Sequence, residues 1–246
     1  MFVDFHCHLE HELLAGGLDG VLKRAVDAGV AKVVSAGSGP EANAAQVSIR
    51  KRFPGTVEIV LGVSPYDVPK CDLQEQLSFI RASRDSIVGI GEIGLDAHHF
   101  SADELPAQEG AFRSQLALAE ELGLPVVVHS RKAEGRVLEI LREFPAVSAM
   151  MHFFLVEKLA LPAVSQGCMV SLPTIKSDSR LKIAVKLPLS SLACETDSPF
   201  GLGPGITSEP KDVVAAYGVV AQARKVSVDD AASGICANAA KFFGWE

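Results

Sequence analysis

The stretch FVDFHCH (2–8) joins a short apolar run to two histidines that lie two residues apart. A short apolar run is typical of a strand that is buried on both faces, as in a parallel sheet. Because alternate residues of a strand share a face, His6 and His8 can bind one cation together, with Asp4 on the same face one layer deeper. Taken alone, the pair also fits two unrelated histidines.

The same arrangement recurs four more times along the chain. The apolar runs are IVGIG (87–91), PVVV (125–128), VSAMM (147–151) and LACET (192–196), and they lead to Glu92, His129, His152 and Asp197. The C-terminal ends of the strands meet at one face of a (β/α)8 barrel, where such enzymes have their active sites. Taken singly, each of these residues could instead be a histidine of the core or the cap of a helix. We expect their side chains to lie together at one metal site.

Strands and helices are expected to alternate eight times, which indicates a parallel sheet with helical crossovers. The predicted strands are 2–5, 31–37, 57–63, 87–92, 125–129, 147–152, 168–172 and 191–197, and the predicted helices are 19–29, 40–53, 71–83, 104–123, 132–144, 156–167, 177–187, 208–224 and 227–243. Asp72 is expected to cap helix 71–83, Ser177 or Asp178 to cap helix 177–187, and Pro162 to break helix 156–167.

The fold class that follows is α/β, a (β/α)8 TIM barrel in a single domain. The length of 246 residues is close to the typical length of such a barrel. We predict one domain over 1–246 that includes the C-terminal helices within 208–243.

Composition excludes several classes of protein. No apolar run approaches the roughly 18 residues that span a bilayer, and the HxH motif begins at residue 6 without a visible secretory signal, so no membrane association is expected. The five cysteines are scattered without a CxxC pair and indicate reduced thiols in the cytoplasm. The net charge of −7, with dispersed Lys and Arg, disfavours tight non-specific DNA binding but permits a small phosphorylated substrate. The oligomeric state is not indicated.

Six candidate metal ligands fit two metal sites better than one. The first site would take His6, His8, Glu92 and Asp197, and the second would take Glu92, His129 and His152, with Glu92 bridging two divalent ions. Zn, Mn or Mg are the candidate ions, and so much imidazole favours Zn, Mn, Co or Fe over Mg. Glu92 and Asp197 are the catalytic candidates, because Asp197 can orient the attacking water or accept its proton.

Substrate contacts are expected from residues that follow other strands. Arg131 in HSRK (129–132) offers a forked donor for phosphate or carboxylate, or else a surface ion pair. Ser64 and Tyr66 in GVSPY (62–66) either contact substrate or belong to a proline-containing turn. Lys176 is a weaker candidate for the mouth of the barrel.

Five motifs together resemble the TatD family of metal-dependent hydrolases, within the amidohydrolase-like barrels. They are DFHCHLE (4–10), GEIGLD (91–96), LPVVVHSRKA (124–133), MMHFF (150–154) and ETDSPF (195–200), and in order and spacing they cover nearly the whole chain. The resemblance implies the same six ligands. It also implies a DNase-like phosphodiester hydrolase activity that depends on divalent metal, often magnesium or manganese.

The chain departs from the family pattern at three places. The G-[IV]-H-P-H segment appears as GVSPY without either histidine, Ala97 followed by His98 and His99 stands where the family commonly has Tyr, and Ser208-Glu209-Pro210 replaces an N-E-P-like segment. The leading hypothesis is a phosphodiesterase that acts on a DNA end or a small phosphodiester. The alternatives are an amide or ester hydrolase of small molecules and a metal-binding scaffold without activity.

Overall fold

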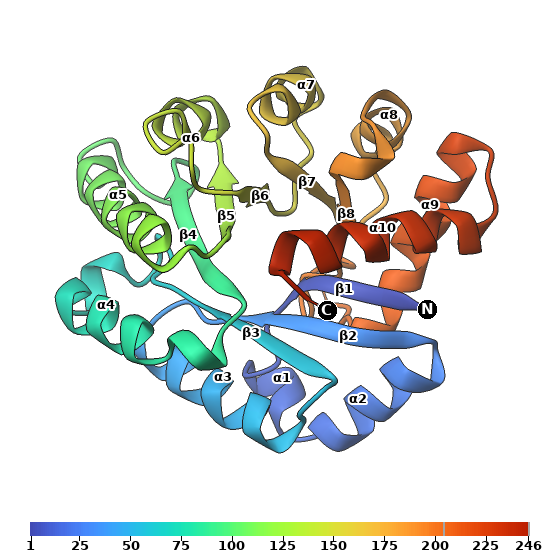
Figure 1. Ribbon diagram of the computed structural model, residues 1–246, viewed down its shortest axis with the longest axis horizontal. Coiled ribbons are helices and arrows are strands. Elements are labelled where there is room, and N and C mark those ends of the chain that lie inside the picture. The colour runs from blue at the N-terminus through green and yellow to red at the C-terminus, as the bar shows by residue number, and fades with distance from the viewer. Residues whose placement is uncertain (204, 246) are drawn as a thin grey trace.

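Eight parallel strands form a ring that is surrounded by helices (Figure 1). The computed structural model describes residues 1–203 and 205–245. Each strand is hydrogen-bonded to the next in chain order, from β1 to β8. A parallel bridge between Cys7 and Ser198 brings the first strand against the segment that follows the last one. The (β/α)8 barrel predicted from the sequence is therefore confirmed, and the predicted domain 1–246 contains two residues, 204 and 246, that lie outside the described ones.

The strands are short and the helices alternate with them. The strands are β1 (Phe2–Cys7), β2 (Val30–Ala36), β3 (Val57–Leu61), β4 (Gly89–Asp96), β5 (Val126–Arg131), β6 (Ala149–Met151), β7 (Met169–Leu172) and β8 (Leu192–Cys194). The α-helices are α1 (Glu12–Ala15), α2 (Leu18–Asp27), α3 (Pro40–Arg52), α4 (Leu73–Ala82), α5 (Leu105–Leu122), α6 (Glu134–Leu141), α7 (Glu157–Ser165), α8 (Asp178–Lys186), α9 (Val213–Arg224) and α10 (Val228–Phe243). In the described part of the chain, 3-10 turns lie at Val68–Lys70, Arg84–Ser86, Leu189–Ser191 and Pro210–Asp212.

Local sequence signals explain where several helices begin and end. The Asp72 carboxylate accepts the backbone N–H groups of Gln74 and Glu75, which confirms the predicted N-cap of α4. Gly123 ends α5 in the left-handed conformation with φ 63°, which a residue without a β carbon adopts at low cost. Ser177 occupies the N-cap position of α8, although its side chain makes no capping hydrogen bond there.

The predicted break at Pro162 is wrong, because α7 runs through it from Glu157 to Ser165. A proline inside a helix removes one backbone hydrogen bond. Ala160 and Ala163, on either side of Pro162, are both fully buried. Their packing against the barrel outweighs the local preference of proline to end the helix.

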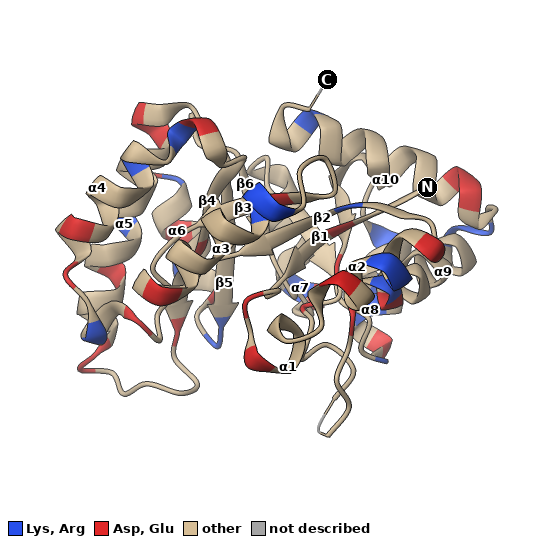
Figure 2. Cartoon of the chain, turned by 90° about the horizontal axis from the view of Figure 1, so that it is seen from below, with Lys and Arg blue, Asp and Glu red and all other residues tan. Residues whose placement is uncertain are grey.

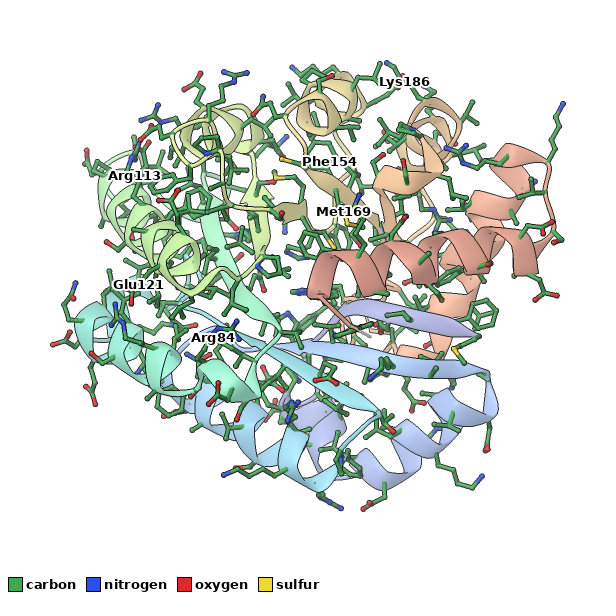
Figure 3. The ribbon with its side chains drawn as sticks, viewed as in Figure 1. Arg84, Arg113, Glu121, Phe154, Met169 and Lys186 are labelled. Atoms are coloured by element: carbon green, nitrogen blue, oxygen red, sulfur yellow. The ribbon has the colours of Figure 1, made fainter. Side chains whose placement is uncertain are left out.

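The two C-terminal helices complete the wall beside β1. In α9, the Tyr217 hydroxyl donates to the carbonyl of Val3 at 2.9 Å and accepts the Val3 N–H at 3.1 Å. In α10, the ring of Phe243 lies 6.0 Å from that of Phe5 between centroids. Phe154 and Met169 point into the core, whereas Arg113 and Lys186 lie at the periphery (Figure 3).

The surface carries both signs of charge. In the view of Figure 2, blue and red segments are interspersed along the helices, as the dispersed Lys and Arg of the sequence indicated. Among the described residues, no helix combines the length and apolar character that crossing a bilayer requires. The five cysteines are all unpaired in this part of the chain.

Candidate metal centre

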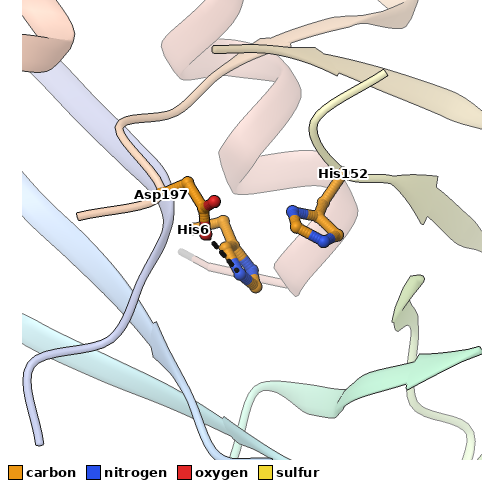
Figure 4. Close-up of side chains that lie close together, drawn as sticks. All are labelled: His6, His152 and Asp197. Carbon is orange, nitrogen blue, oxygen red and sulfur yellow. Dashed lines mark ion pairs between the residues drawn. The ribbon is translucent and has the colours of Figure 1, made fainter. Parts of the chain in front are cut away.

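His6 on β1 and His8, directly after this strand, project toward one point, as their spacing predicted. Their Nε2 atoms lie 3.2 Å apart. The carboxylate Oδ1 of Asp197 lies 3.5 Å from each of these two nitrogens. Figure 4 shows Asp197 facing His6, with His152 on the opposite side of the same space. Residues at the first strand and residues after the last strand therefore contribute to one cluster.

Glu92 lies between two pairs of histidines and divides its carboxylate between them. Its Oε2 lies 3.4 Å from His8 Nε2 and 3.7 Å from His6 Nε2. Its Oε1 lies 2.7 Å from His129 Nδ1 and 3.1 Å from His152 Nε2. A carboxylate that offers one oxygen to each of two neighbouring donor sets has the geometry of a bridging ligand.

The outer ring nitrogens of three histidines face acceptors that lie outside the cluster. His129 Nε2 donates to Asp96 at 3.1 Å, and His8 Nδ1 lies 3.2 Å from the carbonyl oxygen of Ala36. His152 Nδ1 lies 3.6 Å from Glu195, which also accepts the backbone N–H of Phe153 at 2.6 Å. Such partners fix the tautomer and the orientation of a metal-binding imidazole.

Burial and mutual contacts set the charge states of the cluster. Burial alone would raise the pKa of Glu92, but the charge of His152 and hydrogen bonds from His129, His152 and His8 lower that pKa well below its usual range. Burial, reinforced by the neighbouring His152 and His8, lowers the pKa of His6 well below its usual range. An ionised bridging carboxylate and a neutral His6 are the forms that bind metal.

The donor set fits divalent metal. Three groups of ligand atoms lie within 4.8 Å of one another, namely His6 with His8 and Glu92, His6 with His152 and Asp197, and Glu92 with His129 and His152. Ligand atoms at tetrahedral bond lengths of about 2.0–2.1 Å stand about 3.3 Å apart, which is close to the spacings found here. Imidazole and carboxylate together suit zinc, manganese, cobalt or iron.

The backbone aims these ligands through two residues with positive φ. Asp197 has φ 53°, and its N–H donates to the carbonyl of His6 at 2.9 Å, which turns its carboxylate toward β1. Gly94 has φ 142°, and a β carbon there would overlap the carbonyl oxygen of His129. The glycine thus allows β4 to approach β5 closely at His129, near the candidate ligand Glu92.

A cavity of about 950 Å³ opens above the cluster and contains the predicted substrate contacts. Arg131, Ser64 and Tyr66 all line it, together with His129 and Asp197. The Ser64 hydroxyl is buried and donates to Asp67 at 3.4 Å, whereas Tyr66 is 37% exposed. Lys176, the weaker candidate, is not among the described residues that line the cavity, although its neighbour Ile175 is.

Sequence reasoning did not assign Asp96 and Glu195, the carboxylates behind His129 and His152. Both are fully buried. Asp96 carries a signal that could have found it, because it lies four residues after Glu92 and alternate residues of a strand share a face. Glu195 lies within the run LACET, where the apolar character of its neighbours concealed it.

Comparison with known proteins gives one family. The model of the family described as TatD related DNase matches residues 3–244. Human "Deoxyribonuclease TATDN3" is 32% identical, with 98% of this chain and 94% of the human protein covered. "Uncharacterized metal-dependent hydrolase MJ1582" of Methanocaldococcus jannaschii is 30% identical, with 98% and 96% covered. The crystal structure of the TatD homologue YjjV from Escherichia coli K12 superposes with a TM-score of 0.91 at 25% identity, covering 99% of this chain and 98% of that one.

Proposed function

The chain belongs to the family of TatD-related DNases and is a metal-dependent hydrolase, and we propose that it cleaves phosphodiester bonds of a DNA end or of a small phosphodiester. The observation that carries the proposal is the division of Glu92 between two histidine pairs, His6 with His8 and His129 with His152. That arrangement suits two divalent ions with Glu92 between them. A relative named as a deoxyribonuclease, aligned over nearly the whole chain, supports the phosphodiester as substrate.

Each ligand has a defined part in this proposal. His6, His8, Glu92 and Asp197 would hold one ion, and Glu92, His129 and His152 would hold the other. Bound divalent metal polarises a substrate oxygen and lowers the pKa of water. Asp197 directs Oδ1 at His6 and His8, so its second oxygen can orient the attacking water and accept its proton.

The cavity wall supplies the remaining contacts. Arg131 lines the cavity beside His129 and offers a forked donor to the charged oxygens of the phosphodiester. Ser64 and Tyr66 lie on the same cavity and complete the proposed substrate contacts. The ions we propose are zinc, manganese or magnesium, and the unpaired cysteines support a reducing compartment such as the cytoplasm.

One observation favours an amide or ester hydrolase as the second candidate. Much of the cavity wall is apolar, with Phe153, Leu155, Val156, Ile175 and Phe200 among its lining residues. An apolar wall suits a small organic substrate as well as a nucleotide. The same metal ligands can serve hydrolysis of a carbonyl compound, so fold alone does not decide between the two.

Elemental analysis followed by a substrate panel tests the proposal. We expect about two divalent ions per chain, and turnover of bis-p-nitrophenyl phosphate and single-stranded DNA that falls by at least about 100-fold in His129→Ala and Asp197→Ala. His98→Ala is the matched control, because this exposed histidine is outside the cavity lining among the described residues. Activity on amides or esters alone would support the second candidate and overturn the first.

A further inference from the structure

A second group of polar side chains lies directly behind the metal centre, around Asp96 at the end of β4. Asp96 Oδ2 is 2.8 Å from the hydroxyl of Tyr66, 2.8 Å from Nδ1 of His99 and 3.1 Å from Nε2 of His129. Its Oδ1 accepts the backbone N–H groups of His98 and His99, each at 2.8 Å. One buried carboxylate thus joins a proposed metal ligand to two residues that are outside the ligand set.

The bonding pattern fixes which nitrogen of His99 is free. The two oxygens of Asp96 lie within hydrogen-bond distance of two backbone N–H groups, the Tyr66 hydroxyl and one ring nitrogen each of His99 and His129, so Asp96 acts as an acceptor in this group. A bare ring nitrogen at 2.8 Å from a carboxylate oxygen would be repelled. Nδ1 of His99 therefore carries a hydrogen, and Nε2 points away from Asp96, because the two nitrogens of an imidazole face different directions.

The side chain of His99 belongs to the wall of the active-site cavity. Its side chain is 40% exposed and lines the same cavity as Glu92, His129 and Arg131. The backbone holds it near Arg131, because Asp96 pairs with Arg131 in the β4–β5 register and Ala97 N–H donates to the carbonyl of Arg131 at 2.9 Å. Tyr66 packs against the ring of His99 with centroids 5.5 Å apart.

We propose that His99, oriented by Asp96 and held in place by Tyr66, is a substrate-contacting residue that binds an anionic phosphoryl oxygen through Nε2. This assignment rests on the proposed function and adds a residue to it. When Nε2 binds a phosphoryl oxygen, a proton lies between them, and Asp96 balances the positive charge of the ring. Arg131 and His99 then contact the same anionic group from one wall of the cavity, on the side of His129.

The contact predicts a selective effect on substrate binding. A hydrogen bond to a charged group corresponds to about a 10- to 100-fold change in affinity. We expect His99→Ala to raise the KM for bis-p-nitrophenyl phosphate by about that factor, with kcat changed by less than about threefold. The KM for a neutral ester such as p-nitrophenyl acetate should stay within about twofold, because a neutral substrate offers no anionic oxygen.

Three further variants separate contact from structure. His99→Gln places an amide donor at a similar reach and should restore part of the affinity. Tyr66→Phe retains the ring but removes the hydroxyl that donates to Asp96, so it should raise the KM by a smaller factor. His98→Ala removes the neighbouring exposed histidine and should leave the KM unchanged.

Binding of inorganic phosphate gives a readout that does not need turnover. By calorimetry with the zinc-loaded protein, we expect His99→Ala to weaken phosphate binding at least about tenfold relative to wild type and to His98→Ala. If wild type hydrolyses no phosphodiester, the proposed function is wrong. The calorimetric measurement of phosphate binding then still tests the role of His99. If His99→Ala matches wild type in both KM and phosphate affinity, or if His98→Ala has an equal effect, the assignment of His99 is wrong.

Discussion

Asp197, one of the proposed metal ligands, has an uncommon backbone conformation. Left-handed φ values cost an ordinary residue about 1–2 kcal/mol, and Asp and Asn tolerate them best among residues that have a β carbon. Its φ of 53° is held by the hydrogen bond from Asp197 N–H to His6 and by the one from His8 N–H to Ser198. Strained conformations of this kind collect at functional sites.

Substitution of Asp197 should separate conformation from chemistry. Asp197→Asn keeps a side chain that accepts the left-handed conformation but loses the charge, so we expect the metal-free variant to match the thermal stability of the metal-free wild type, and kcat to fall by about 100-fold or more. Asp197→Ala should lose activity equally and in addition lose about 1 kcal/mol of stability. Thermal unfolding and steady-state kinetics check both. Retention of more than a tenth of wild-type kcat in Asp197→Asn would exclude Asp197 as the proton acceptor.

The proposed site residues were predicted from features that the sequence itself shows. The spacing of His6 and His8, and the position of His129 and Asp197 after apolar runs, are visible without coordinates. The contacts of Tyr66 with Asp96 and with His99 are not visible, because they join the turn after β3 to the end of β4 and the loop after it, through side chains thirty or more residues apart. Only tertiary structure gives such contacts.

At the scale of elements, β4 and β5 are longer than predicted, and their extra residues lie at the candidate site. The predicted strands 87–92 and 125–129 end at the ligands, whereas β4 continues to Asp96 and β5 to Arg131. The sequence did not predict these longer strands, because the polar and glycine residues that follow each apolar run have a local preference for turns. Pairing between the two strands, from Gly94 with His129 to Asp96 with Arg131, overrides that local preference.

Gly94 is the point where this pairing is most sensitive. Gly94→Ala would place a β carbon against the carbonyl oxygen of His129 and would force φ 142° on an alanine. We expect a loss of about 3 kcal/mol or more in the free energy of unfolding, with weaker metal binding, because overpacking and a strained backbone act together. Urea unfolding measures the change. The matched control is Gly110→Ala in α5, where a β carbon meets nothing within 4 Å and should stabilise the helix by about 1 kcal/mol. Equal stability of the two variants would contradict this role of Gly94.

Outside the barrel, α5 and α6 are joined by a charged network centred on Glu109. Its carboxylate accepts two hydrogen bonds from Arg136, at 2.7 and 2.8 Å, and one from Arg113 at 2.9 Å. Arg113 also binds Glu143, and Figure 3 shows it at the edge of the molecule. Hydrogen bonds from Arg136 and Arg113 lower the pKa of Glu109 to about 2.

The lowered pKa gives a stability difference that depends on pH. The folded pKa lies below the unfolded one, so the contribution of Glu109 is present above about pH 4.5 and is lost as pH falls toward 2. Solvent screening limits it to about 1 kcal/mol or less at pH 7. We therefore expect Glu109→Gln to be less stable than wild type by that amount at pH 7 and equal to it near pH 2. Denaturant unfolding across this range is the measurement, with Glu120→Gln, an exposed residue of the same helix, as control. A difference between Glu109→Gln and wild type that grows on acidification would refute the assignment.

At the scale of the whole molecule, the metal centre joins segments that are distant in sequence. Three of the six proposed ligands lie on β1, β4 and β5, and the other three follow β1, β6 and β8. The barrel itself could be predicted, because eight alternations leave few other architectures. The packing of α9 and α10 beside β1 could not, because the contacts of Tyr217 with Val3 and of Phe243 with Phe5 join opposite ends of the chain.

Removal of metal should therefore lower the stability of the entire barrel. An ion present at about 100 times its dissociation constant stabilises the folded state by about 2.7 kcal/mol. For a domain of this length, 1 kcal/mol corresponds to about 2–4 °C in Tm, so each ion contributes about 5–10 °C. We expect EDTA to lower Tm by that amount for each ion removed, and zinc or manganese to restore it. His129→Ala, which lacks a ligand of one site only, should show about half the shift of wild type. If elemental analysis proves the metal gone while Tm stays within 1–2 °C of the loaded protein, then the ions do not hold these strands together, and the convergence of the ligands is maintained by the fold alone.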